Sequence, residues 1–284
     1  MKKNMKKLIQ MEKIVIFGAG YHGRMAYRKI REKDPKKKII FIDNGVKKKA
    51  KIFFKEKILN PKSIMKTEYE KIILCGRYIK EQKKQLKSLG IQKNLIFWGR
   101  KDLKPNKKIL SERLKKYLII LKEIFTIFEK NNINYWADYS GLLALMRKQN
   151  IAEMSDFDIC FNADDSKKII KLLKKNSKYR IETRYHFNSK IKKKIYPQII
   201  IFGKCNFNKM EPPTIDFIPR VFYKNKNEEL KLDKNITIRS DYWNGYKTIG
   251  YKGLKLRAPL NSEQYLKKLY GKTWNKEENF WYAK

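Results

Sequence analysis

Asp156-Phe157-Asp158-Ile159-Cys160-Phe161 is the stretch that decides how this sequence is interpreted. Its alternation of apolar and polar residues predicts a β-strand. Residues two apart in a strand point to the same face, so the carboxylates of Asp156 and Asp158 project side by side. Like charges at that separation need protonation or a cation between them. The stretch therefore predicts a carboxylate site for Mg²⁺ or Mn²⁺, which prefer oxygen ligands and also bind phosphate oxygens.

A third carboxylate, Asp216, lies in a second predicted strand, Thr214-Ile215-Asp216-Phe217-Ile218. An acid inside an apolar strand is costly unless it is paired or metal-bound. We therefore predict that Asp156, Asp158 and Asp216 hold the metal and carry catalysis. Three separated cysteines and two histidines argue against a disulfide framework, a structural zinc site or a histidine-based metal centre.

Upstream, Ser140-Gly141 precedes a predicted helix from Gly141 to Lys148. Small residues and free N–H groups at a helix start favour phosphate binding. Arg147 lies on the same predicted helix, where it either holds a phosphate group or is solvated. Asp138, at the end of a short predicted strand, either caps the helix or contacts substrate.

Taken together, residues 135–147 and the Asp156-Phe157-Asp158-Ile159 stretch resemble the LicD (choline-phosphotransferase) family, to which fukutin-type proteins are related. The resemblance extends from about Tyr117 to Trp274. Its C-terminal part consists of Pro259, Tyr265-Leu266, Tyr270-Gly271 and Trp274. Two departures stand out. Ser140-Gly141 replaces the usual Gly-Thr, and Glu153-Met154-Ser155 replaces Trp-Asp-Asp, so two acidic positions of the motif are lost.

The resemblance implies a nucleotidyltransferase fold and transfer of phosphocholine or a polyol phosphate from a CDP-activated donor. It also implies that the acceptor is a glycan or lipid-linked sugar, as in capsule or lipopolysaccharide biosynthesis. By the same resemblance, Ser140, Gly141 and Arg147 would bind the donor. Two other functions remain open. One is a nucleotidyltransferase-fold enzyme that acts on RNA or a small molecule, and the other is an inactive nucleotide-sugar-binding scaffold.

The N-terminal half alternates predicted strands and helices, which indicates a mainly parallel sheet. After the strand at 13–17, Gly18-x-Gly20-x-x-Gly23 opens a helix, and Asp43 ends the next strand at the position of a ribose-binding acid. This pattern predicts a Rossmann-like domain that binds NAD, another nucleotide or no ligand. The half also resembles Rossmann-like domains of bacterial surface-polysaccharide enzymes, in Ile-Phe-Gly-Ala-Gly at 16–20 and Phe-Ile-Asp-Asn at 41–44.

We expect two α/β domains that meet near the polar segment around Pro105. Residues 1–105 would form the Rossmann-like nucleotide-binding domain and residues 106–284 the α+β nucleotidyltransferase-like domain. A long amphipathic helix is predicted at the start of the second domain, from Leu110 to Phe128.

Composition bears on partners and location. The chain has 284 residues and a formal net charge of +41, with lysines spread along its whole length. Such a charge suits anionic partners, including nucleotides and an anionic membrane surface, and a basic cluster at Lys190–Lys194 is one place for that contact. Since no nucleic-acid recognition motif is visible, nucleic acid is not expected as the partner. No apolar run is long enough to span a bilayer, so we expect a cytoplasmic protein, with peripheral contact to the inner face of the membrane left open.

Overall fold

The computed structural model describes residues 13–45, 56–76, 78–103, 105–176, 178–185, 197–204, 210, 212–220, 229–233, 236–239 and 245–276. One of the two histidines, His186, and one of the three cysteines, Cys205, lie outside these residues, as does the lysine cluster at 190–194. The chain divides into two compact units, Met1–Ile109 with Asn206–Glu211, and Leu110–Cys205 with Pro212–Lys284. Within the described residues, no helix is both long and apolar enough to cross a membrane.

Unit 1 is built on a five-stranded sheet in which every strand pair is parallel, in the order β3-β2-β1-β4-β5. Its strands are β1 (Lys13–Phe17), β2 (Lys38–Ile42), β3 (Ile58–Leu59), β4 (Lys71–Cys75) and β5 (Leu95–Trp98). Its helical segments are α2 (Tyr21–Lys33), η1 (Pro61–Lys66), α3 (Ile79–Ser88) and α4 (Arg100–Leu103). The predicted alternation of strands and helices around a parallel sheet is confirmed.

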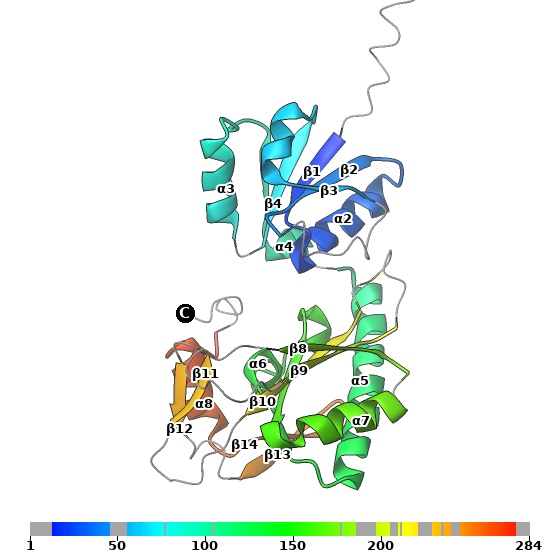
Figure 1. The fold of residues 1–284 in the computed structure, drawn as a ribbon, viewed down its shortest axis with the longest axis vertical. Helices are drawn as coiled ribbons and strands as arrows, with labels where there is room; N and C mark the ends of the chain where they lie inside the picture. Colours follow the sequence, from blue (N-terminus) through cyan, green and yellow to red (C-terminus); the bar gives the residue numbers. More distant parts are fainter. Residues whose placement is uncertain are drawn as a thin grey trace, which may run out of the picture. The chain divides into compact units, whose positions relative to one another are not determined.

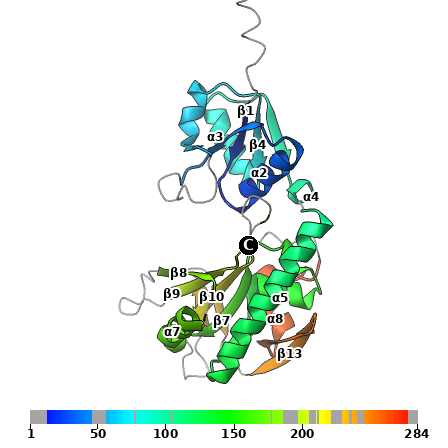
Figure 2. The same ribbon diagram turned by 90° about the vertical axis from the view of Figure 1, so that its right-hand side faces the viewer.

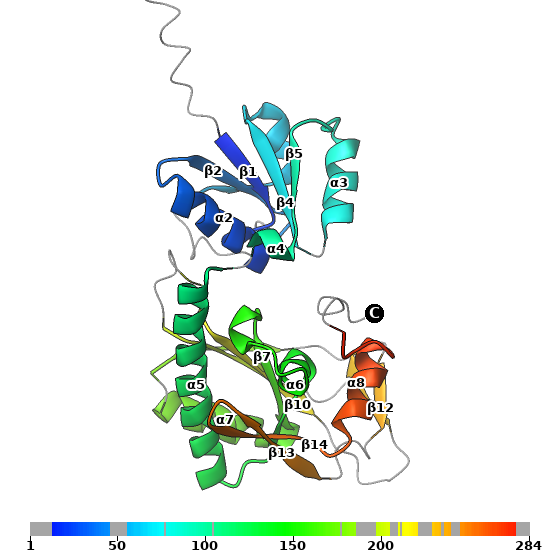
Figure 3. The ribbon, with the colours of Figure 1, turned by 180° about the vertical axis from the view of Figure 1, so that it is seen from behind.

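Successive residues of β1 are buried on opposite faces of this sheet. Ile16 packs with α2 in one hydrophobic cluster, and Val15 and Phe17 pack with Leu86 of α3 in another. Figures 1 and 3 show α2 and α3 on the two sides of the sheet. Burial on both faces explains why these strands are continuously apolar in sequence.

Unit 2 contains a second five-stranded sheet in the order β6-β7-β10-β9-β8. Its strands are β6 (Tyr135–Ala137), β7 (Phe157–Asn162), β8 (Arg180–Tyr185), β9 (Pro197–Phe202) and β10 (Thr214–Arg220). β7 and β10 run parallel, and the other three pairs are antiparallel. Two further hairpin-like pairs are β11 (Glu229–Asp233) with β12 (Ile236–Arg239), and β13 (Tyr246–Tyr251) with β14 (Leu254–Pro259).

The helical segments of unit 2 are α5 (Lys107–Lys130), α6 (Tyr139–Met146), η2 (Ile151–Glu153), η3 (Ala163–Asp165), α7 (Ser166–Asn176) and α8 (Ser262–Tyr270). The long helix α5, visible along the unit in Figure 2, covers the predicted amphipathic segment and extends it at both ends. The predicted helix at 141–148 instead begins at Tyr139, since Asp138 caps it there. The antiparallel strands β8, β11, β12, β13 and β14 were not predicted.

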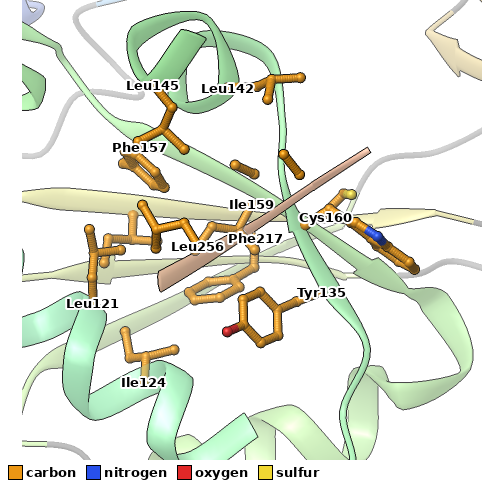
Figure 4. Packing of buried hydrophobic residues seen from close by; sticks show 14 of the residues in the cluster. Leu121, Ile124, Tyr135, Leu142, Leu145, Phe157, Ile159, Cys160, Phe217 and Leu256 are labelled. Carbon is orange, nitrogen blue, oxygen red and sulfur yellow. The ribbon is translucent and has the colours of Figure 1, made fainter. Parts of the chain in front are cut away.

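The core of unit 2 lies between α5 and one face of its sheet (Figure 4). Phe157 and Ile159 of β7 and Phe217 of β10 point to this face, and the Phe217 ring meets the Phe128 ring of α5 edge-on at 5.4 Å. Because strand side chains alternate, Asp158 and Asp216 point to the opposite face. The core thus fixes which face of the sheet carries the carboxylates.

Candidate metal-carboxylate site

The three predicted carboxylates come together at one place. Asp216 lies directly opposite Asp158 in the parallel pairing of β10 with β7, and Asp156 immediately precedes β7. One oxygen from each of the three groups lies within 4.8 Å of the other two. The structure therefore brings together Asp156, Asp158 and Asp216 from two strands that are separated by more than fifty residues in sequence.

The electrostatics of this cluster favour a bound cation. Asp158 is 9% exposed. Burial, followed by the charges of Asp156 and Asp216, raises the pKa of Asp158 well above its usual value, while the hydrogen bond from Ser140 acts in the opposite direction. Burial and the charge of Asp156 likewise raise the pKa of Asp216 to about 7. A divalent cation would relieve this repulsion without protonating the acids.

The partners of Asp216 support the same conclusion. Its Oδ2 accepts a hydrogen bond of 2.9 Å from the amide of Gln198 on β9. Its Oδ1 is buried and has no hydrogen-bond partner among the described residues. A buried carboxylate oxygen without a partner is costly, and Mg²⁺ and Mn²⁺ are cations whose preferred ligands are such oxygens. The three carboxylates therefore fit a hard divalent metal as its ligands.

The start of α6 is held against the carboxylates. The Ser140 hydroxyl donates to the carboxylate of Asp158, and the Ser140 backbone N–H donates to the same oxygen at 3.0 Å. A Cβ atom on Gly141 would lie 2.5 Å from the backbone oxygen of Asp158, so only glycine permits this approach of helix to strand. Ser140 and Gly141 are thus brought to the acids, with Ser140 orienting one of them.

A buried polar network lies beside the same helix start. Asp138 is fully buried and caps α6 by accepting from the Tyr139 N–H at 2.7 Å, which confirms the predicted capping role. Its carboxylate also pairs with the guanidinium of Arg220 at the end of β10 and accepts from the hydroxyl of Tyr265 on α8. Burial and the charge of Asp138 raise the pKa of Tyr265, so this phenol stays protonated and donates.

Arg113 of α5 links the two segments that lead into the carboxylates. It is 1% exposed, and its guanidinium donates to the carbonyls of Ala152 at 2.5 Å, Ser155 at 3.4 Å and Pro212 at 3.4 Å. Ser155 precedes Asp156, and Pro212 lies four residues before Asp216. Arg113 therefore holds both approaches to the acid cluster from a single point on α5.

Tyr117, one helical turn after Arg113, reinforces this connection. Its hydroxyl donates to the Thr214 carbonyl and accepts from the Thr214 N–H, both at 3.2 Å. Arg113 also donates to this hydroxyl at 3.4 Å. The sequence predicted an amphipathic helix here but not these contacts, because Arg113 and Tyr117 bond to backbone atoms that no side-chain motif reveals.

Arg147, predicted to contact donor phosphate, lies at the other end of α6 from Ser140. It is the C-terminal cap residue of the helix, and its guanidinium donates to the backbone carbonyl of Trp274. Seven residues of helix separate the two ends by about 10 Å. The structure therefore places Arg147 at a junction between α6 and the segment after α8, apart from the acid cluster.

The glycine turn of unit 1 has its own geometry. Gly18 has φ of +102°, and a Cβ on Gly23 would overlap the carbonyl oxygen of Gly18, so both positions need glycine. Gly20 caps α2, with open space where its Cβ would stand. The carboxylate of Asp43 accepts from the N–H groups of Ala19 at 2.8 Å and Gly45 at 2.7 Å. Asp43 thus fastens the turn to the end of β2, a structural role that the sequence did not predict.

Comparison with known proteins finds a family match in the second unit. Residues 132–261 match the family model of the LicD/FKTN/FKRP nucleotidyltransferase domain. This match supports a nucleotide- or phosphotransferase-like role and agrees with the predicted LicD resemblance. Residues 10–97 match the C2185-like N-terminal domain, a description that names no nucleotide. Among curated proteins, none matches the chain.

Two solved structures are similar to part of the chain. The lincosamide antibiotic adenylyltransferase LnuA, bound to lincomycin, is 19% identical and covers 51% of this chain and 82% of its own, with a TM-score of 0.35. A protein of Thermotoga maritima that is assigned as a nucleotidyltransferase is 15% identical and covers 53% of this chain and 81% of its own, with a TM-score of 0.33.

Proposed function

We propose that this protein is a metal-dependent phosphotransferase that moves phosphocholine or a polyol phosphate from a CDP-activated donor to a hydroxyl of a cell-surface glycan or lipid-linked sugar. The observation that carries the proposal is the cluster of Asp156, Asp158 and Asp216 on one sheet face, with a buried oxygen of Asp216 that has no hydrogen-bond partner in the part of the chain that the structure describes. The family match of residues 132–261 supports the transferase class.

In this proposal, the three carboxylates hold one or two Mg²⁺ or Mn²⁺ ions. A bound ion supplies positive charge that offsets the charge of the donor diphosphate and of the departing cytidine monophosphate. The start of α6, with Ser140 and Gly141, lies beside the acids, where the positive end of the helix dipole favours the donor phosphate. Ser140 meanwhile keeps the Asp158 carboxylate in one orientation.

The reaction exchanges one phosphorus–oxygen bond for another. The acceptor hydroxyl oxygen forms a bond to the phosphorus that bears the alcohol. The bond from this phosphorus to the bridging oxygen breaks, and cytidine monophosphate leaves with that oxygen. The hydroxyl proton passes to a carboxylate of the cluster, which we assign to Asp216.

Metal binding tests this function most directly. Titration of the full chain with Mn²⁺, followed by electron paramagnetic resonance, should show tight binding that Asp158→Asn abolishes. Glu263→Gln, which removes an exposed acid from α8, serves as the control and should bind like the wild type. Transfer from CDP-choline or a CDP-polyol should also disappear in Asp158→Asn. Undiminished transfer by that variant would sink the assignment.

The same measurements separate the other functions. Thermal shifts with CDP-alcohols, cytidine triphosphate and adenosine triphosphate, each with and without Mg²⁺, compare phosphotransfer with nucleotidyl transfer. The proposal expects the largest Mg²⁺-dependent shift with a CDP-alcohol, whereas a larger shift with a triphosphate would indicate nucleotidyl transfer. A wild type that binds no Mn²⁺ would indicate a scaffold without catalysis.

For unit 1, we propose a Rossmann-like domain whose glycine turn binds the phosphate groups of a nucleotide. The β3-β2-β1-β4-β5 order and the open surroundings of Gly20 at the start of α2 support it. The Asp43 carboxylate already accepts hydrogen bonds from two backbone N–H groups. The proposal therefore rests on recognition of the phosphate groups and not on binding of the ribose by Asp43. Binding of nicotinamide and uridine nucleotides to the wild type and to Gly20→Asp tests it.

A further inference from the structure

We propose that Arg184, on the edge strand β8, binds a phosphate oxygen of the nucleoside diphosphate donor beside the three carboxylates. This inference rests on the proposed function and names a residue that supplies positive charge to it. Arg184 lies outside every motif that the sequence suggested for donor binding.

Strand register places Arg184 next to the site. Arg184 is directly opposite Gln198 in the antiparallel pairing of β8 with β9, and such pairs have Cβ atoms about 5 Å apart. The Gln198 amide in turn donates to Asp216 at 2.9 Å, and Asp216 is opposite Asp158. A chain of neighbouring side chains therefore leads from Asp158 and Asp216 through Gln198 to Arg184.

The same register puts Arg184 on the face that carries the acids. Asp216 pairs with Ile200, and Ile200 pairs with Glu182 of β8. Residues two apart in a strand share a face, so Glu182 and Arg184 point to the acid side. Ile181, which immediately precedes Glu182 and so points to the other face, packs against the core.

Arg184 is available for a ligand. Its side chain is 58% exposed, and its guanidinium lies 3.9 Å from the carboxylate of Glu182. Glu182 lies closer to Arg180, at 3.1 Å, and the Arg180 guanidinium also stacks over the Phe202 ring. An exposed ion pair of this length contributes little energy, so a phosphate group can displace it.

The charges at the site explain why a cation is needed there. Three carboxylates and a diphosphate together carry more negative charge than one divalent ion can offset. A guanidinium binds phosphate oxygens through two parallel N–H groups, which suits it to this position. The charge of Arg184 already reaches the acids, since it lowers the pKa of Asp216 against the opposing effects of burial and Asp156.

The strand offers a matched control for the test. Arg180 is on the same face of β8 and shares Glu182 as a partner, but its register partner is Phe202, two positions further along β9 from Ile200. Arg184→Gln removes the proposed contact, Arg184→Lys keeps the charge but not the planar fork, and Arg180→Gln removes an equivalent charge away from the acids.

Calorimetric titration of the full-length variants with CDP, and with inorganic pyrophosphate, is performed in saturating Mg²⁺. Arg184→Gln should weaken both affinities by about tenfold or more, as expected for loss of a charge-assisted hydrogen bond. Arg184→Lys should lose less, and Arg180→Gln should stay within about twofold of the wild type. Mn²⁺ binding without nucleotide should be retained in all three variants.

Equal CDP affinity in the wild type and Arg184→Gln would overturn this inference while leaving the metal site intact. An equal loss in Arg180→Gln would also overturn it, because the effect would then be one of general surface charge. Absence of Mn²⁺ binding in the wild type would instead overturn the proposed function, and this inference with it. The Mn²⁺ titration thus distinguishes the two failures.

Discussion

Asp216 on β10 faces Asp158 on β7 across a parallel strand pair, so two carboxylates occupy neighbouring positions on one sheet face. Since the folded protein raises the pKa of both groups, ionising them without a metal destabilises the fold. The unfolded chain ionises its aspartates near pH 4, whereas Asp216 in the folded chain does so at about 7. The free energy of unfolding contributed by Asp216 is therefore fully present below pH 4 and lost as the pH rises to about 7.

We predict that the metal-free protein loses thermal stability across this window, and that Asp216→Asn reduces the loss. At pH 7.5 the variant should be more stable than the metal-free wild type, by about 1–2 kcal/mol. Mg²⁺ should raise the melting temperature of the wild type at that pH and leave Asp216→Asn unchanged. Melting curves from pH 4 to 8, with and without Mg²⁺, measure both effects. A wild type whose metal-free stability rises from pH 4 to 7 would contradict this picture.

The contact between Gly141 and the Asp158 backbone predicts a sharp sensitivity to one methyl group. Gly141→Ala places a Cβ 2.5 Å from a backbone oxygen. We expect a loss of about 1–3 kcal/mol in the free energy of unfolding and weaker Mn²⁺ binding, since Asp158 must move. Gly250→Ala in β13 is the control, because a Cβ there meets no atom within 4 Å. Denaturant unfolding and Mn²⁺ titration measure the stability and the metal affinity of both variants. Equal values in the two variants would contradict the close contact between Gly141 and the Asp158 backbone.

The buried network of Asp138, Arg220 and Tyr265 predicts that the two partners of Asp138 contribute unequally to stability. Arg220→Met leaves a buried carboxylate without its cation and should cost about 3–5 kcal/mol. Tyr265→Phe removes one hydrogen bond and should cost about 1–2 kcal/mol. The exposed Tyr246 provides a control, and Tyr246→Phe should be neutral. Chemical denaturation gives all three values, and a neutral Arg220→Met would be incompatible with the pairing.

Arg113 predicts an effect on metal binding that is transmitted through backbone carbonyls. Arg113→Met removes the donors that hold the Ala152, Ser155 and Pro212 carbonyls. We expect a loss of about 2–4 kcal/mol in stability and about tenfold weaker Mn²⁺ binding, because both approaches to the cluster loosen. Arg113→Lys should restore part of each.

The variant Ile124→Ala distinguishes a role of Arg113 in positioning the carboxylates from a general loss of stability. Ile124 is a buried core residue of the same helix, and its truncation should cost a similar 2–5 kcal/mol or so. Under conditions where both variants are folded, it should keep wild-type Mn²⁺ affinity. Equal affinities in Arg113→Met and Ile124→Ala would leave Arg113 with a structural role alone.

The sequence predicted the carboxylate cluster because its physical signal is local. Asp156 and Asp158 are two apart in a strand, and Asp216 interrupts an apolar strand. The N-terminal strands and the long helix were also predicted, since continuous apolar runs and helical spacing are properties of single segments. Asp138 as a helix cap belongs to the same class of signal.

What the sequence did not predict depends on pairing across distance. Arg184 reaches the site only through the β8–β9–β10 register. The sequence of β8, Arg-Ile-Glu-Thr-Arg-Tyr, is polar at four of its six positions and so is not marked as a strand. Arg113 bonds to backbone carbonyls, which every residue possesses, so no motif identifies its partners. Asp43 looked like a ligand-binding acid because a turn-fastening acid occupies the same sequence position.

The contacts of Arg113 and Tyr265 have a consequence for the preparation of the second unit alone. The family match spans residues 132–261, but Arg113 of α5 precedes that range and Tyr265 of α8 follows it. A fragment trimmed to the match would leave three carbonyls without their donor and the buried ion pair without its phenol. The shortest autonomous piece should therefore begin with α5 and continue past α8 to the carbonyl of Trp274 that Arg147 holds.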